Sequence, residues 1–232
     1  MKAQKGEKFI KDLIIGSTFN YIRCSIIVQG RKRDMRLSGG QLAGGNSTSE
    51  KAENDFYATD PKTVDLFMER ALNDGLFQDM QNQKIWECAC GNGNIAEVLK
   101  SYFPESTIQA TDLVDRGYGI GNVDFLKSTS TAQMIITNPP FSLMNDFIQK
   151  GLKLTEKYLV FFAKIQTLEG IERKKMLEKS PLKYVYVHST RQATWKNGQP
   201  RDDKGKKWAT TMFLAWFVWD KTYTGEPVIR FL

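Results

Sequence analysis

The sequence predicts an α/β domain built on a mostly parallel sheet that helices cover on both faces. Short apolar segments typical of strands alternate with segments of helical periodicity, and the connections between them are short. Two late apolar segments, about 183–188 and 211–219, have no helix between them, which predicts an antiparallel hairpin with a long projecting connection. The chain's 232 residues are enough for one sizeable domain of this kind.

The first helix has the clearest signals. Asp60 is a good N-cap, Pro61 suits the first helical position, and Gly75 suits the C-terminal stop. Between them, apolar residues at helical spacing mark one buried face: Val64, Phe67, Met68, Ala71 and Leu72. We expect further helices at about 94–103, 143–154 and 169–178, and further strands at about 84–89, 107–111, 133–137 and 157–163.

The N-terminal region differs from the rest in composition. We interpret residues 1–53 as a basic arm followed by a Gly- and Ser-rich loop, and residues 54–232 as the folded domain. The longest apolar run, 212–219, has eight residues, whereas a membrane-spanning helix needs roughly 20. Three cysteines cannot build a disulfide framework. We therefore expect a cytoplasmic protein that does not contact a membrane.

The excess positive charge is confined to two segments. Residues 1–36 hold nine basic and three acidic residues, and residues 191–208 hold six basic and two acidic residues. The net charge of the chain is +7, so the remaining residues together carry −3. This distribution favours contact with a polyanion such as nucleic acid at two places. The alternative is that both segments are simply solvated.

A glycine-rich turn follows the predicted strand at 84–89. Gly91, Gly93 and Ala96 fit the G-x-G-x-x-G/A pattern, in which small residues let the backbone turn tightly and approach a ligand. Asp112 lies 19 residues past Gly93, at the end of the next strand, where it is placed to accept hydrogen bonds from ribose hydroxyls. The ligand is then a dinucleotide or S-adenosylmethionine (AdoMet), unless the glycines only form a tight turn.

Glu87 favours AdoMet over a dinucleotide. It stands four residues before the first glycine, where a carboxylate suits the amino group of AdoMet and disfavours a pyrophosphate. Its alternative role is helix capping or a salt bridge. Cys88 and Cys90 resemble a metal pair, but a structural zinc site needs four ligands, so we interpret them as small buried residues.

An Asn-Pro-Pro-Phe tetrapeptide, Asn138–Phe141, ends the apolar segment 133–137. The two prolines remove two backbone donors, which leaves the Asn138 side-chain oxygen and the Pro139 carbonyl as acceptors. Acceptors without competing donors suit an exocyclic amino group, and the ring of Phe141 suits stacking on a planar base. The alternative is a Pro-rich strand-to-helix turn with a core phenylalanine.

The tetrapeptide resembles motif IV of the amino-group DNA methyltransferases, particularly the N6-adenine enzymes of small bacteriophage and prophage type. Glu87–Gly93 resembles their motif I, Asp112 matches the acid of motif II, Asn122–Phe125 resembles motif III, and Phe56–Pro61 resembles motif X. Two departures stand out. The usual aromatic residue of motif I is replaced within Cys88–Cys90, and no large separate target-recognition domain follows the motifs.

The resemblance implies a Rossmann-like class I fold with a seven-stranded sheet in the order 3-2-1-4-5-7-6. It also implies AdoMet as the methyl donor and no metal. The residues that it assigns to the cofactor are Tyr57, Thr59, Glu87, Cys88, Gly91, Gly93, Asp112, Asp124, Phe125 and Asn138. The residues that it assigns to catalysis are Asn138, Pro139, Pro140 and Phe141.

The implied reaction is methylation of adenine N6 in DNA, on a base flipped out of the duplex. Phe141 would stack on the base, with Tyr57 or Phe56 near its opposite face, and Lys164 and Gln166 would line the base pocket. The expected location is the cytoplasm of a bacterial host or phage-infected cell. The alternatives are methylation of adenine in RNA on the same fold and an inactive nucleic-acid-binding relative.

Basic and aromatic residues in the two basic segments are the candidates for contact with nucleic acid. They are Arg31, Lys32, Arg33, Arg191, Trp195, Lys196, Arg201, Lys204, Lys206 and Lys207. Trp208 stands near the other end of the second segment, where it would instead anchor the hairpin in the core.

Overall fold

The computed structural model describes residues 23–28, 31–36, 56–192, 194–201, 203–206 and 212–232. The chain divides into two compact units, residues 1–48 and 49–232. In the first unit, β1 (Arg23–Val28) pairs antiparallel with β2 (Arg31–Arg36). The sequence has apolar stretches at 9–15 and 21–28, whose periodicity does not decide between strand and helix. The second is a strand over its described residues, and the first lies outside the described residues.

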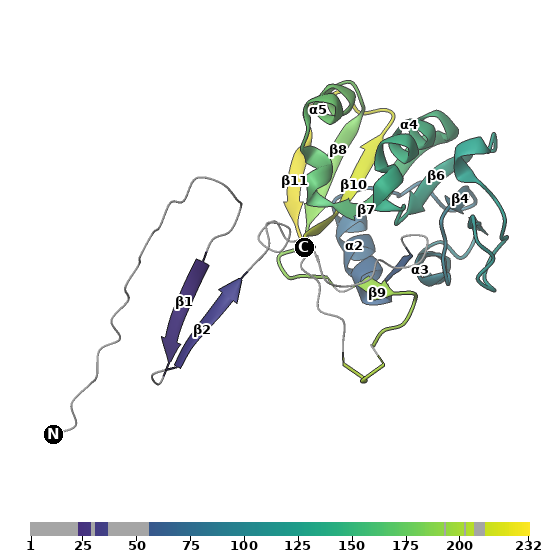
Figure 1. Ribbon diagram of the computed structural model, residues 1–232. Coiled ribbons are helices and arrows are strands. Elements are labelled where there is room, and N and C mark those ends of the chain that lie inside the picture. The colour runs from purple at the N-terminus through teal and green to yellow at the C-terminus, as the bar shows by residue number, and fades with distance from the viewer. Residues whose placement is uncertain (1–22, 29–30, 37–55, 193, 202, 207–211) are drawn as a thin grey trace. The chain divides into compact units, whose positions relative to one another are not determined.

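The second unit contains a seven-stranded sheet whose strands run in the order β11-β8-β10-β7-β6-β4-β5 (Figure 1). β10 is antiparallel to both of its neighbours, and the other pairs are parallel. The strands are β4 (Lys84–Glu87), β5 (Thr107–Ala110), β6 (Ala132–Thr137), β7 (Thr155–Lys164), β8 (Leu182–Val187), β10 (Leu214–Asp220) and β11 (Val228–Phe231). The predicted α/β class, the mostly parallel sheet and the antiparallel hairpin are confirmed.

Helices cover both faces of this sheet. They are α2 (Pro61–Asn73), α3 (Asn94–Tyr102), α4 (Met144–Leu154) and α5 (Ile171–Glu178). Successive residues of the central strands point to opposite faces, as pleating requires. In β7, Val160 and Phe162 join the core that α2 and α3 complete, whereas Leu159 and Phe161 join the core that α4 completes. Burial on both faces explains why these strands are apolar without alternation.

The first helix begins and ends as its sequence predicts. The Asp60 side chain accepts a hydrogen bond from the Lys62 backbone N–H, Pro61 occupies the first helical position, and Gly75 adopts φ +81° after the last turn. Among the described residues, no helix is both long and apolar enough to cross a membrane.

The strand order differs from the expected 3-2-1-4-5-7-6 at both edges. From β5 to β8 the order corresponds to 2-1-4-5-7-6, but no strand of the described chain lies outside β5. The segment that would form it contains Gly117 and Gly119, whose φ angles of +79° and +66° interrupt an extended backbone. Only an isolated bridge joins Thr111 to Ile120. The seventh strand is instead β11, which pairs with β8 at the opposite edge.

The long connection between β8 and β10 returns to the domain. Within it, β9 (Thr194–Lys196) pairs antiparallel with β3 (Tyr57–Thr59), so that Ala58 faces Trp195 in the register. The expectation of a connection that only projects from the domain was therefore incomplete. Its middle part joins the strand that precedes α2.

Candidate functional site

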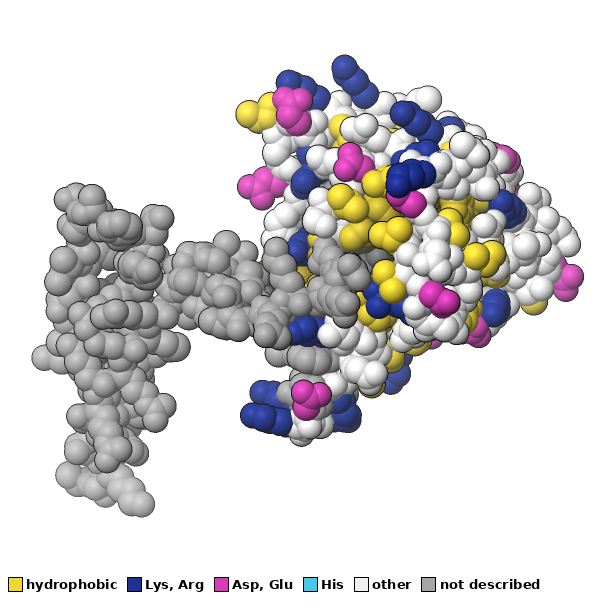
Figure 2. Space-filling view, turned by 45° about the vertical axis from the view of Figure 1, so that its right-hand side comes forward, with side chains coloured by type: hydrophobic (Ala, Val, Ile, Leu, Met, Phe, Trp, Pro, Cys, Tyr) yellow, Lys and Arg dark blue, Asp and Glu magenta, His cyan; other side chains and the backbone are white. Residues whose placement is uncertain are grey.

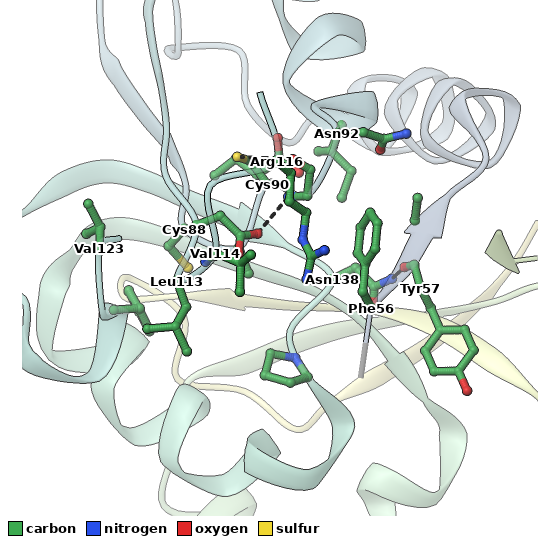
Figure 3. Close-up of a pocket in the computed structure, with 18 of the residues that line it drawn as sticks. Phe56, Tyr57, Cys88, Cys90, Asn92, Leu113, Val114, Arg116, Val123 and Asn138 are labelled. Atoms are coloured by element: carbon green, nitrogen blue, oxygen red, sulfur yellow. Dashed lines mark hydrogen bonds between the residues drawn. The ribbon is translucent and has the colours of Figure 1, made fainter. Parts of the chain in front are cut away.

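A pocket of about 830 Å³, counting the open space at its mouth, lies beyond the carboxyl ends of β4, β5 and β6 (Figure 3). Ligands of open α/β sheets bind at this edge. β3, the glycine turn after β4, the segment after β5 and the turn after β6 form its walls. In the space-filling view, apolar side chains surround a hollow on the surface (Figure 2).

The two glycines of the turn have left-handed backbone angles and lie against aromatic rings. Gly91 and Gly93 adopt φ +56° and +84°, a region that favours glycine. A Cβ added at Gly91 would lie 2.4 Å from a carbon of the Phe56 ring, and one at Gly93 would lie 2.5 Å from the Tyr118 ring. Glycine is therefore required here by the backbone angle and by two packed aromatic rings.

Asp112 ties the glycine turn to the end of β5. One carboxylate oxygen accepts from the Gly91 N–H at 2.8 Å and the other accepts from the Val114 N–H at 2.9 Å. The residue is 9% exposed and lines the pocket. A carboxylate has about four acceptor positions, so these two bonds leave acceptor capacity for a ligand.

Glu87 is buried at the end of β4 and caps α3. Its side chain is 1% exposed, and Oε2 accepts from the Ala96 N–H at 2.8 Å, in the first turn of the helix. The capping role considered from the sequence is thus present, and Glu87 also lines the pocket. Burial raises the pKa of the carboxyl well above its ordinary value, the Ala96 hydrogen bond lowers it, and the charge of Asp112 raises it.

The two cysteines are free thiols at the same strand end. Cys88 and Cys90 are both buried and line the pocket. Burial first, and then the charge of Glu87, raise the pKa of the Cys90 thiol to about 12, so it stays protonated at neutral pH. Within the described residues, no group of three or more His, Cys, Asp and Glu side chains is arranged to hold a metal ion.

Asn138 is held in place by direct hydrogen bonds to β3. Its side-chain Nδ2 donates to the Tyr57 carbonyl at 2.7 Å and to the Thr59 hydroxyl at 3.2 Å. Because a carbonyl can only accept, the amide nitrogen must face β3, and this fixes which way the amide points. Oδ1 therefore lies on the side of the amide opposite these two bonds, as an oriented acceptor in a pocket-lining residue.

The rest of the tetrapeptide combines packing with an aromatic surface. Pro139 is buried, Pro140 lines the pocket, and Phe141 begins a short 3-10 helix, η3 (Phe141–Leu143). The rings of Phe141 and Tyr57 are nearly parallel, at 20°, with centroids 6.3 Å apart. The ammonium group of Lys164 lies 4.6 Å from the centroid of the Phe141 ring. Gln166 follows in η4 (Ile165–Leu168) and its carbonyl accepts from Arg173.

Asp124 and Phe125 line the other end of the pocket. The Asp124 side chain caps η2 (Phe125–Lys127) by accepting from the Leu126 N–H at 3.0 Å. Phe125 is 3% exposed and its ring packs edge-on against Trp86. Both residues thus have structural roles in addition to their place on the pocket wall.

Phe56 and Arg116 both line the pocket, although from the sequence Phe56 was expected to have only a minor role and Arg116 was not singled out. The Arg116 guanidinium carbon lies 4.0 Å from the centroid of the Phe56 ring, and both residues line the pocket. The Phe56 ring also lies against Gly91 and Gly198. The signal for Arg116 was present: a lone basic residue in a glycine-rich segment, four residues after Asp112.

The candidate nucleic-acid residues fall into two groups. Arg31, Lys32 and Arg33 lie on β2, in the first unit. In the second unit, the Arg191 guanidinium covers the Phe213 ring at 4.6 Å, and Trp195 and Lys196 are half-buried in β9. Arg191 is exposed, as are Arg201, which donates to the Gly205 carbonyl, Lys204 and Lys206. Lys207 and Trp208 lie outside the described residues.

The basic side chains of the connection gather on one part of the surface. Figure 2 shows Lys and Arg side chains on a protrusion at the bottom of the view, where Figure 1 places the connection around β9. The basic connection contains β9, and β9 pairs with β3. The connection is therefore attached to the strand whose Tyr57 carbonyl accepts a hydrogen bond from Asn138.

No protein-family model matches the chain, and no curated protein matches its sequence. Its structure resembles the type I restriction-modification methyltransferase subunit of Streptococcus thermophilus, with 15% identity, a TM-score of 0.54, 82% of this chain covered and 50% of that chain. It also resembles a candidate class I AdoMet-dependent methyltransferase of Listeria monocytogenes, with 14% identity, a TM-score of 0.51, and 83% and 69% covered.

A third similar structure is a candidate RNA methyltransferase of Pyrococcus horikoshii, with 12% identity, a TM-score of 0.51, and 75% and 90% of the two chains covered. The chain spans about half the length of the Streptococcus subunit. At these identities the comparisons establish the fold. The chain has the Rossmann-like fold of class I AdoMet-dependent methyltransferases.

Proposed function

We propose that this protein transfers a methyl group from AdoMet to N6 of adenine in DNA. The observation that carries the proposal is the orientation of Asn138. Its Nδ2 is committed to Tyr57 and Thr59, so the amide oxygen remains as an acceptor for an amino group. Asparagine followed by two prolines provides acceptors without nearby backbone donors, which suits an exocyclic amine.

The cofactor side of the pocket offers the donors and acceptors that AdoMet needs. Asp112 has acceptor capacity left for ribose hydroxyls, and Glu87 suits the amino group of the methionine moiety. Asp124 and Phe125 would line the adenine end. When bound, AdoMet supplies an electrophilic methyl group on its sulfonium.

The acceptor side would bind a planar base. Phe141 offers a ring face for stacking, Tyr57 lies next to it, and Lys164 supports the ring by a cation–π contact. The oxygens of Asn138 and Pro139 would accept the N6 hydrogens and turn the nitrogen lone pair toward the methyl group. Nothing in this scheme requires a nucleophilic side chain, because the rate gain comes from positioning.

Nucleic acid as the substrate is supported by charge and by fold. The basic residues of the β8–β10 connection lie on a segment whose strand β9 pairs with β3, beside the proposed base site. Among the similar structures is a methyltransferase subunit of a restriction-modification system. A candidate RNA methyltransferase is also similar, so RNA is the acceptor to be tested against DNA.

The decisive experiment is transfer of labelled methyl from AdoMet to unmethylated duplex DNA, with RNA in parallel. Hydrolysed product is analysed for N6-methyladenine, and Asn138→Ala is the control. We expect label in DNA as N6-methyladenine and none with the variant. Label only in RNA would keep the mechanism and change the substrate. An absence of AdoMet binding, measured by calorimetry, would refute the enzyme proposal and favour a nucleic-acid-binding relative.

A further inference from the structure

Arg116 brings a positive charge into the pocket. It belongs to the loop that follows Asp112, and its side chain reaches into the pocket beside the Phe56 ring (Figure 3). Its guanidinium carbon is 4.0 Å from the centroid of that ring. Its Nε is buried and has no hydrogen-bond partner among the described residues. A buried donor without a partner costs free energy, so a bound ligand that accepts a hydrogen bond from Nε would stabilise the protein.

The two acidic residues nearest to Arg116 in sequence bond to backbone N–H groups instead. Asp112 accepts from Gly91 and Val114, and Asp115 accepts from Gly117. The guanidinium lies over the Phe56 ring, which in turn packs against Gly91 and Gly198. The positive charge is therefore near the glycine turn, and a guanidinium can form two parallel hydrogen bonds to a carboxylate.

Glu87 provides a carboxyl group at the same turn, which an ammonium group bound beside it would favour in the ionised form. Glu87 and Arg116 both line the pocket. The α-carbon of an amino acid carries an ammonium and a carboxylate together. An acid and an arginine near one turn match this pair of charges.

We propose that Arg116 binds the α-carboxylate of the methionine moiety of AdoMet. This inference rests on the proposed function, since it assigns one more contact within that cofactor site. The charge on Arg116 then discriminates between ligands with and without the amino-acid part, while the adenosine part is held elsewhere in the pocket.

Calorimetry with two ligands tests the assignment. The ligands are AdoMet, which carries the carboxylate, and 5′-methylthioadenosine, which lacks the whole amino-acid end. We expect Arg116→Ala to weaken AdoMet binding roughly 10- to 100-fold, the range for a charged hydrogen bond, and to leave 5′-methylthioadenosine binding within about 2-fold. Arg116→Lys should lie between wild type and Arg116→Ala, because it keeps the charge and loses the planar fork.

Two further variants control for structure. Phe56→Leu removes the stacking surface and should give a smaller loss that is also selective for AdoMet. Arg173→Ala removes an arginine of α5 that bonds to Asn145 and to the Gln166 carbonyl, and it should leave both affinities unchanged. Thermal melting of each variant shows whether it is folded.

The outcomes separate the two proposals. Equal losses for both ligands in folded Arg116→Ala, or AdoMet binding that is unchanged or tighter, would overturn the role of Arg116 and leave the enzyme proposal standing. Failure of the wild-type protein to bind AdoMet would overturn both.

Discussion

The two sides of the pocket are held together in different ways. On the glycine-turn side, Glu87 and Asp112 bond to backbone N–H groups of segments that follow β4 and β5. On the tetrapeptide side, Asn138 depends on Tyr57 and Thr59, about 80 residues earlier in the chain, and their strand in turn pairs with β9. The proposed cofactor side is thus built from neighbouring parts of the sheet edge, whereas the proposed acceptor side depends on segments distant in sequence.

This difference indicates how the sites are expected to fail. A change on the glycine-turn side should disturb folding and cofactor binding together, because the carboxylates that hold the backbone there are also the proposed contacts to the cofactor. A change on the tetrapeptide side should remove transfer while leaving cofactor affinity intact.

The largest effect is expected for Asn138→Ala. Loss of one oriented group that acts on the reacting atoms typically costs about 10²- to 10³-fold in rate. Methyl transfer should fall by at least this amount, and AdoMet affinity should change by less than about 3-fold, because the proposed partner of the Asn138 amide oxygen is the base. Single-turnover transfer and calorimetry measure the two quantities. Loss of cofactor affinity would contradict the separation of the two sides.

Thr59→Val is the matched change on the same contact. It removes the longer of the two hydrogen bonds to Nδ2 and keeps the bond to the Tyr57 carbonyl. We expect a smaller loss of transfer than for Asn138→Ala, again at constant cofactor affinity.

The next effect concerns the glycine turn. Gly91→Ala combines a strained backbone angle with a clash against Phe56, whereas Gly75→Ala has a similar φ of +81° with nothing within 4 Å of the added Cβ. We expect Gly75→Ala to cost about 1 kcal/mol of unfolding free energy and Gly91→Ala about 1–3 kcal/mol more. Urea unfolding measures both. Equal losses would mean that Phe56 moves away freely.

Regular elements were predictable from the sequence because their signals are local. The face of α2, its Asp60 cap and the apolar strands of the core follow from periodicity and capping within a few residues. The tetrapeptide was also placed correctly, at the end of β6. The hydrogen bond that orients the Asn138 amide was not predictable, because it joins two segments that are far apart in the sequence, the tetrapeptide and β3.

Long-range contacts account for what was missed. β3 and β9 have three residues each, too few for a pattern, and more than 130 residues separate them. The outer strand expected beyond β5 gives way to a loop with positive φ at Gly117 and Gly119. For Glu87 the sequence located the residue but could not separate capping from ligand binding, since both roles need a carboxylate at the same strand end.

A moderate effect is expected for the basic connection, which joins the acceptor side through β9. Replacing Lys204, Lys206 and Lys207 by alanine should weaken DNA binding and make its salt dependence shallower, by roughly 1 in the log–log slope for each phosphate that is no longer neutralised. Lys174 and Lys175 of α5 are ion-paired on the surface, and their replacement is the matched control. An unchanged slope would exclude the connection from the interface.

The smallest effect is expected for the protonation of Glu87. Burial raises the pKa of this carboxyl above its ordinary value of 4.5. Above that value the folded protein keeps a proton that the unfolded chain has released, so stability falls as pH rises toward the raised pKa. Glu87→Gln keeps an acceptor for the Ala96 N–H and cannot ionise, so this part of the pH dependence should disappear.

Urea unfolding of wild type and Glu87→Gln at about pH 5 and about pH 8 measures the difference in unfolding free energy, which should grow in favour of the variant as the pH rises. AdoMet should instead bind more weakly to the variant, because an ammonium group favours the ionised carboxylate. Glu87 would then lower the stability of the free protein at high pH and strengthen the binding of AdoMet. Identical pH profiles of the two proteins would show that Glu87 is ionised without a cofactor, with its capping bond to α3 outweighing burial.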